Sequence, residues 1–504
     1  MRWAALLLIT AATLQARQEV LRGRVTDGQR PLAGVRVGLD WPRQVHPRAD
    51  HAVVETDAAG AFALPLPAGA PRRLVLEKTG WNRDIIPEGG WKAEFRMSAA
   101  PLHRREKVLV VRLEIPGETE EVPDSALRHL FFNRGWGVAS AANYFQEISK
   151  GALDLEEGHW MRLRYPNPLG LEPDDETHDL AQWVLGQLRD LPLGSLDQVN
   201  NATGAVDPDG CPDHLWVILP GPPRSITTQP EHLKPISLLE PLPWKKSLRW
   251  PVVLFPDQVV LGNVVHEAMH AMGEHRVDDF YLGCDDPLTA GIWDVMDVGM
   301  YRGWDRHHPL EGPWVDDTAY SPSQPMGWTR AALWYRGAFR ATVPELRVKG
   351  RTWEGWIDPL ERAPGVLPQR VVVPDPRRKG RFWELSVRRP WGFDAGTVAG
   401  RVGSGREGLV VARVDPSRLS PDDPRGPVRV IDAHPGTQEP SQPRFPCGRF
   451  ELDDAAFNLG EGEIDAGEDG PLAWAIVAQD GEGRLKVRLR LKAPKARSQP
   501  RRPH

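Results

Sequence analysis

The sequence predicts a multi-domain protein in which a mixed α/β domain lies between two β-rich regions. With 504 residues, of which 40% are hydrophobic, the chain is long enough for more than one folded core. Its 48 glycines and 49 prolines indicate many turns and short strands. Strand–turn patterns occupy both ends of the chain, whereas strands and helices alternate from about residue 105 to 340.

The composition excludes several classes of protein. The 63 lysines and arginines against 68 aspartates and glutamates give a net charge of −5, so no basic field favours nucleic acid as a partner. The hydrophobic and charged fractions exclude a disordered chain, a coiled coil and a polytopic membrane protein. The 20 tryptophans, against 6 tyrosines, suggest exposed aromatic surface as well as β-domains. We expect a monomer.

Residues 1–16 have the pattern of a secretory signal peptide. Arg2 precedes an apolar run from Trp3 to Thr13, and small residues lead to a cleavage point at Ala16. The run is too short to cross a bilayer of about 30 Å, and no other stretch approaches the ~20 apolar residues that a spanning helix needs. The alternative is an ordinary buried N-terminal helix. The pattern predicts export, so the mature protein is secreted or periplasmic and has no membrane span.

Residues 17–100 are expected to form an antiparallel β-sandwich. Short strands are predicted at 20–25, 31–37 and 61–64, with turn residues between them. The motifs G-x-V-x-D at 23–27, P-x-x-G-V-x-V at 31–37 and T-D-x-x-G-x-F at 56–62 resemble the carboxypeptidase-regulatory-like (transthyretin-like) sandwich. That resemblance implies a module without a catalytic role. The sequence shows no clear propeptide, so the module is either kept or removed on activation.

Residues 104–342 are expected to form the central α/β domain, and residues 343–491 a β-rich C-terminal domain. Apolar runs predict central strands at 107–115, 152–155 and 214–219, and helical spacing predicts helices at 140–148, 179–188 and 259–272. Ser140 is the expected N-cap of the first helix. C-terminal strands are predicted at 382–387, 408–414, 473–478 and 485–491, followed by a disordered basic tail, 492–504.

The helix predicted at 259–272 carries the pattern H-E-x-x-H. His266 and His270 are four residues apart, so both imidazoles lie on one face of the helix and can reach one Zn²⁺ ion. Glu267 is then placed as the general base that takes a proton from metal-activated water and passes it to a leaving amine. The alternative, a surface helix with two histidines, conflicts with the apolar residues that flank the pattern.

The third metal ligand decides the subclass of such a site. No glutamate occurs between His275 and Leu310, which disfavours a layout with a glutamate one helix further on. Gly273 lies where H-E-x-x-H-x-x-G-x-x-H/D places its glycine, but the residue three positions later is Arg276, which cannot bind zinc. His275, Asp278 and Asp279 remain the candidates.

Several separate segments resemble the M6 family, the immune-inhibitor-A-like group of secreted metallopeptidases. The pattern H-E-x-x-H-x-x-G is followed by D-x-Y at 279–281 and by the Met-turn W-D-x-M-x-x-G at 293–299, and Y-F-x-E-x-S-x-G-x-L-D-L occurs at 144–155. The likeness extends over about 105 to 415. It implies a metzincin-like zinc peptidase domain that acts on proteins or peptides.

The resemblance also assigns two further residues. It makes Asp279 the third zinc ligand, although the D-x-Y element lies two residues later than the family spacing, so His275 and Asp278 stay open. It makes Tyr301, after the Met-turn, a group that polarises the scissile carbonyl or holds the oxyanion. The alternative for Tyr301 is a packed surface tyrosine.

Calcium is a further expected cofactor, at oxygen-rich loops that contain Asp207, Asp209 and Asp213 or Asp285 and Asp286. Turn chemistry explains the Asp-Pro-Asp-Gly segment equally well. The three cysteines, Cys211, Cys284 and Cys447, are too few for a disulfide scaffold. They form either one Cys211–Cys284 pair with a free Cys447, or three buried thiols.

The sequence therefore predicts an exported zinc endopeptidase, with Glu267 as general base, His266, His270 and Asp279 as ligands, and Tyr301 as an auxiliary catalytic residue. A non-catalytic exported binding protein, with a Trp-rich surface and a vestigial metal site, is the alternative. A metal hydrolase that acts on a bond other than a peptide bond is a third possibility, since the same water activation serves several substrates.

Overall fold

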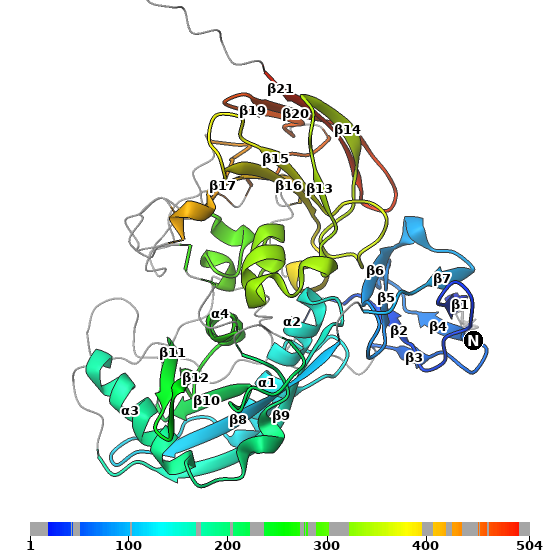
Figure 1. The fold of residues 1–504 in the computed structure, drawn as a ribbon. Coiled ribbons are helices and arrows are strands. Elements are labelled where there is room, and N and C mark those ends of the chain that lie inside the picture. Colours follow the sequence, from blue (N-terminus) through cyan, green and yellow to red (C-terminus); the bar gives the residue numbers. More distant parts are fainter. Residues whose placement is uncertain are drawn as a thin grey trace, which may run out of the picture.

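The computed structural model describes a large part of the 504-residue chain. The described residues are 19–41, 43, 51–100, 103–167, 173–201, 205–221, 236–272, 277, 279–280, 289–301, 322–395, 407–419, 426–435, 452, 454–460 and 463–492. The predicted signal peptide and nearly all of the predicted tail lie outside these residues. The described part is multi-domain and rich in β-structure, with five sheets (Figure 1).

The N-terminal region is a sandwich of two small sheets that share one apolar core. One sheet has the strand order β4 (Ala61–Leu66), β1 (Glu19–Thr26), β7 (Glu94–Arg96). The other has the order β3 (Val53–Glu55), β2 (Arg36–Leu39), β5 (Arg73–Glu77), β6 (Asp84–Pro87). Side chains from both sheets, among them Phe62 and Leu74, meet in one buried cluster.

The strand predicted at 31–37 is wrong in its first half. Only Arg36–Leu39 pairs as a strand, and the preceding residues turn. Gly34 has a φ of 66°, which favours glycine, and the amide of Val35 donates to Thr56 Oγ1 at 2.9 Å instead of to a neighbouring strand. A side chain thus replaces a ladder hydrogen bond at this position, which an alternating pattern does not reveal.

The central region contains a five-stranded sheet in the order β11 (Ile236–Leu242), β12 (Lys245–Pro256), β10 (His214–Leu219), β8 (Arg104–Glu114), β9 (Leu153–Arg164). The last four strands are parallel, and the edge strand β11 runs antiparallel to β12. Four α-helices accompany the sheet in the described residues: α1 (Asp124–Phe132), α2 (Ala141–Ile148), α3 (Pro173–Leu188) and α4 (Leu261–Ala271).

Helices cover both faces of this sheet, which follows from the alternation of side chains along a strand. On β8, Val108 and Val110 join the apolar cluster that holds α1, α2 and α4, whereas Leu109 and Val111 join the cluster that holds α3. Both faces are therefore buried along this part of β8, and residues 108–111 form a continuous apolar run. The predicted N-cap of α2 is confirmed, because Ser140 Oγ accepts the amide of Asn143 at 3.2 Å.

The C-terminal region is a second sandwich. Its five-stranded sheet has the order β13 (Glu345–Arg347), β15 (Arg370–Pro374), β16 (Phe382–Arg388), β17 (Gly408–Val414), β18 (Val428–Val430). Its four-stranded sheet has the order β14 (Thr352–Ile357), β21 (Leu485–Leu491), β20 (Leu472–Gln479), β19 (Ala466–Asp469).

The larger C-terminal sheet contributes to two cores. Trp383 and Leu385 on β16 pack against the smaller sheet, whereas Phe382 on the same strand and Val410 on β17 join the central core around α2 and α4. The C-terminal sandwich is consequently continuous with the core of the central domain, and Figure 1 shows it on the side of the central sheet where α2 and α4 lie.

The described tryptophans lie mainly in or against the apolar cores. Five of them, Trp216, Trp250, Trp293, Trp334 and Trp383, are fully buried. Among the described tryptophans only Trp244 is exposed, at 38%. The exposed aromatic surface that the composition suggested is therefore wrong for the described part of the chain. No helix among the described residues is long and apolar enough to cross a membrane.

Candidate metal centre

Helix α4 presents the H-E-x-x-H residues from inside the molecule. The helix follows the inner strand β12, and most of its side chains are buried in the central core. Gly262, in its first turn, lies against the backbone of Met300, where a Cβ atom would sit 1.7 Å from the carbonyl oxygen. The absence of a side chain lets α4 approach the 291–301 segment closely. His266 is buried and His270 is half-buried as a result.

Two imidazoles and one carboxylate converge on a single point. His266 Nε2 and His270 Nε2 are 3.1 Å apart. Asp279 Oδ1 lies 2.9 Å from His266 Nε2 and 3.1 Å from His270 Nε2. The structure therefore places Asp279 beside both helix histidines. His275 and Asp278, the other candidates for the third ligand, lie outside the described residues.

Backbone carbonyls fix the orientation of both imidazoles. His266 Nδ1 lies 2.8 Å from the carbonyl oxygen of Val295, and His270 Nδ1 contacts the carbonyl oxygen of Val277. A neutral imidazole that donates from Nδ1 has its lone pair on Nε2, and these are the two nitrogens that meet beside Asp279. The donor set, its tautomers and its carboxylate thus fit a zinc ion.

The charge of Asp279 and the imidazole of His266 stabilise each other. Burial by itself would lower the pKa of His266, but the hydrogen bond and the negative charge of Asp279 outweigh it and raise this pKa to about 9. Burial would raise the pKa of Asp279, and the hydrogen bonds from His266 and His270 instead lower it below the ordinary value. A cation that binds here must displace the proton of His266.

Glu267 lies beside this point and is held by the edge strand β11. Ser237 Oγ is 3.2 Å from Glu267 Oε2 and also contacts the main-chain carbonyl of Glu267. Burial raises the pKa of Glu267, an effect that the nearby histidines partly offset. A carboxylate with a raised pKa is a better base at neutral pH than an exposed glutamate. Sequence reasoning missed Ser237, since a serine in an apolar strand carries no signal of its own.

The segment predicted as a Met-turn supplies the carbonyl that orients His266. Asp294 folds this segment: its Oδ1 accepts the amide of Met296 at 2.9 Å, and its Oδ2 accepts the amide of Met326 at 2.8 Å and the hydroxyl of Thr329 at 2.5 Å. These bonds fix the backbone on both sides of Val295. Burial nevertheless raises the pKa of Asp294 to about 6.

A second aspartate anchors the start of the same segment. Asp297 Oδ2 accepts the amides of Ala290 and Gly291, both at 2.7 Å. Two 3₁₀ turns, η3 (Gly291–Trp293) and η4 (Val298–Tyr301), flank the pair of aspartates. Tyr301 is the last residue of η4, but its side chain lies outside the described part, so its predicted catalytic role stays a prediction.

The aspartates proposed for calcium have other contacts where the structure describes them. Asp209 accepts the amides of Asn201 at 3.0 Å and Cys211 at 2.9 Å, and Asp213 accepts three backbone amides, those of Lys107, Gln198 and Val199. The Asp209–Cys211 bond, two residues apart, is turn chemistry, whereas the bonds of Asp213 tie its loop to residues 107, 198 and 199. Asp285 and Asp286 lie outside the described residues.

Of the three cysteines, the structure describes Cys211 alone. It is a buried free thiol whose Sγ lies 3.6 Å from the carbonyl oxygen of Arg249. Cys284, its predicted partner, and Cys447 are outside the described residues.

A second group of metal-ligating side chains occurs in the C-terminal region. One ligand atom each of Asp432, His434 and Asp454 lie within 4.8 Å of one another. All three residues are half-buried, and His434 Nδ1 lies 2.7 Å from the carbonyl oxygen of Asp454. This group contains one imidazole, whereas the group on α4 contains two and lies beside Glu267, so the α4 group fits a hydrolytic zinc centre better.

Asp279→Ala is expected to weaken zinc binding by at least about 100-fold, because even an outer partner of a metal ligand contributes 10–100-fold. The measurement is zinc affinity by competition with a chromophoric chelator. His275→Ala and Asp278→Ala are the matched controls and should change the affinity by less than about threefold. A large loss in either control, with Asp279→Ala unaffected, would show that Asp279 is not the third ligand.

Comparison with models of known protein families gives no match, and comparison with curated protein sequences gives none either. The interpretation of the centre therefore rests on its own geometry and on the sequence motifs.

Proposed function

We propose that the chain is an exported zinc-dependent endopeptidase with a metzincin-like catalytic domain of the M6 type. The observation that carries the proposal is the convergence of His266 Nε2, His270 Nε2 and Asp279 Oδ1, with every pair within 3.1 Å, beside Glu267. Two imidazoles and one carboxylate are a ligand set typical of catalytic zinc. Export rests on residues 1–16, which lie outside the described residues.

In this proposal each side chain has a distinct role. His266, His270 and Asp279 hold the zinc ion, which when bound supplies the Lewis acidity that activates water and polarises a scissile carbonyl. Glu267 accepts the proton of the attacking water on its carboxylate and delivers it to the leaving amine. Ser237 restrains the Glu267 carboxylate, and the carbonyls of Val295 and Val277 restrain the two imidazoles.

The alternative, a binding protein with a vestigial metal site, has less support. It depended on a tryptophan-rich surface, and the described tryptophans lie mostly in the cores. A vestigial site would also not need the restraints that hold both imidazoles and the glutamate.

The purified protein is expected to contain about one zinc ion per chain at the α4 centre and to hydrolyse casein. The reason is that the chain supplies three zinc ligands and a general base. A strong chelator should abolish hydrolysis, and added zinc should restore it. Elemental analysis and release of acid-soluble peptides measure the two quantities. Hydrolysis that survives complete removal of the metal would overturn the proposal.

A further inference from the structure

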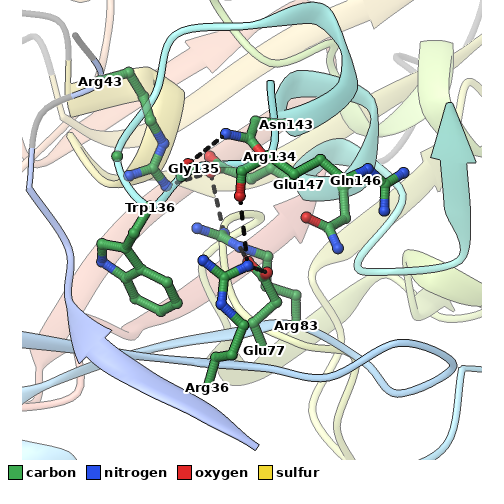
Figure 2. Close-up of a pocket in the computed structure, with 11 residues that line it drawn as sticks. Arg36, Arg43, Glu77, Arg83, Arg134, Gly135, Trp136, Asn143, Gln146 and Glu147 are labelled. Atoms are coloured by element: carbon green, nitrogen blue, oxygen red, sulfur yellow. Dashed lines mark hydrogen bonds and ion pairs between the residues drawn. The ribbon is translucent and has the colours of Figure 1, made fainter. Parts of the chain in front are cut away.

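The N-terminal sandwich meets the other two domains at a buried carboxylate. Glu147, at the end of α2, is 1% exposed. Its Oε2 lies 2.5 Å from Arg43 Nη2 and 3.0 Å from Arg83 Nη1, and both arginines belong to the sandwich. Figure 2 shows these side chains lining one pocket together with Arg36, Glu77 and Arg134.

The other oxygen of Glu147 accepts hydrogen bonds from the central and the C-terminal domain. Its Oε1 accepts Gln324 Nε2 at 3.0 Å and the amide of Phe393 at 2.7 Å. Gly392 has a φ of 60°, and a Cβ there would lie 1.8 Å from the same oxygen, so glycine lets this loop approach the carboxylate. Three separate parts of the chain therefore share one buried charge.

The charges around this pocket are balanced, so it does not have the excess of positive charge that an anion site needs. Arg36 pairs with Glu77 at 2.8 Å, and Arg134 pairs with Asp154 at 2.6 Å. Arg43 and Arg83 pair with Glu147, and their side chains are only 4% and 8% exposed. A buried carboxylate without these cations would keep its desolvation penalty without compensation.

Further contacts spread the sandwich over both neighbours. Asp40 accepts the amide of Gly392 at 3.0 Å, and Trp136 Nε1 donates to the carbonyl of Leu39 at 2.9 Å. Asp84, on β6 of the sandwich, accepts a hydrogen bond from Nε of Arg362 in the C-terminal domain at 3.0 Å. The sandwich thus has polar contacts with both the central and the C-terminal domain, and these contacts are buried or half-buried.

The same carboxylate is linked to the segment that orients His266. Gln324, which donates to Glu147, follows Ser323, whose amide donates to the carbonyl of Gly299 at 2.9 Å and whose hydroxyl contacts the carbonyl of Ile292. Ile292 and Gly299 bracket Val295, the residue whose carbonyl holds His266 Nδ1 at 2.8 Å. A short series of buried bonds thus runs from the sandwich to the metal centre.

We propose that the N-terminal sandwich is a permanent part of the folded enzyme, in which Arg43 and Arg83 act through Glu147 as positioning residues for the turn that holds His266. The catalytic part of this inference rests on the proposed function, whereas the permanence of the sandwich does not. Removal of this segment on activation would take both arginines from Glu147 and would break the contacts of Asp40 with Gly392 and of Asp84 with Arg362.

Permanence is tested in the full-length protein with a site-specific protease sequence introduced between Ala100 and His103. After cleavage, the two pieces are expected to elute together as one 1:1 complex in gel filtration. Separation of the pieces, with the larger piece still folded, would overturn the inference. This readout does not depend on hydrolysis, so it remains valid if the proposed function fails.

Positioning is tested with the double variant Arg43→Met/Arg83→Met. Its zinc affinity, measured by chelator competition, is expected to fall by about tenfold, the effect typical of an outer partner. Adding Glu147→Gln to the double variant should restore zinc affinity by at least half of the lost log units. The reason is that Glu147 then leaves no unpaired buried charge. Arg36→Met, which alters the same pocket without touching Glu147, should leave the affinity unchanged. An unchanged affinity in the double variant, or no rescue, would refute the positioning role.

Discussion

Replacing Glu267 by glutamine is expected to reduce peptide hydrolysis by about 10²–10⁴-fold while one zinc ion per chain stays bound. Glutamine has nearly the same shape and still reaches Ser237, but it cannot accept a proton from water. His266, His270 and Asp279 are untouched, so metal content and folding should be unchanged. Initial rates on casein, elemental analysis of zinc and the thermal unfolding midpoint measure these three quantities.

The control for this variant is Glu55→Gln, at an exposed position of β3 in the N-terminal sandwich. It removes the same charge far from the metal centre and should leave the rate within about twofold. Full activity in Glu267→Gln would show that another group is the base. Loss of zinc in that variant would show instead that Glu267 contributes to binding the metal.

Replacing Arg388 by methionine is expected to lower the free energy of unfolding by about 3–5 kcal/mol. Arg388 lies on β16 with a side chain 2% exposed, and its guanidinium binds Asp394 at 2.7 Å and Glu361 at 3.2 Å. It also donates to the carbonyl of Trp293 at 2.8 Å and to that of Gln324 at 3.0 Å. Methionine fills a similar volume but leaves two buried carboxyl groups without their cation.

Denaturation by urea, followed by tryptophan fluorescence, measures this loss. Arg488→Met is the matched control: Arg488 is 63% exposed in its side chain and pairs with Glu354 at 2.8 Å. Such a surface ion pair contributes about 0–1 kcal/mol, so the control should unfold close to the wild type. Equal midpoints for the two variants would contradict the expectation that the buried ion pairs of Arg388 stabilise the fold.

The pattern of residues predicted well those elements whose stability is local or depends on one apolar face. Helix α4 was predicted within two residues because its apolar spacing continues through the H-E-x-x-H pattern. Ser140 was correctly predicted as an N-cap, because its bond to the amide of Asn143 lies within one helical turn. Helix α1 was missed because no side chain caps its start. The β11–β12 hairpin was missed because Pro241 and Pro251 interrupt the strand pattern.

The metal centre divides in the same way. The placing of His266, Glu267 and His270 on one short helix follows from helical geometry alone, because residues four apart share a face. The approach of Asp279 to both histidines is a contact that only the tertiary structure shows, whereas His275 and Asp278, the other two candidates, lie outside the described residues. Ser237 comes from an edge strand that precedes α4, and no local pattern links it to Glu267.

By itself the sequence determined which reactive groups α4 carries: the imidazoles of His266 and His270 and the carboxylate of Glu267, at a fixed helical spacing. It also placed this apolar helix between two β-rich regions. Only the tertiary structure decided what restrains that chemistry. It placed the Val295 and Val277 carbonyls on the imidazoles, and it brought Arg43 and Arg83 onto the buried Glu147. The physical reason is distance along the chain. Spacing within a helix is set by local backbone geometry. The pairing of buried Glu147 with Arg43, 104 residues away, is set instead by how whole domains pack.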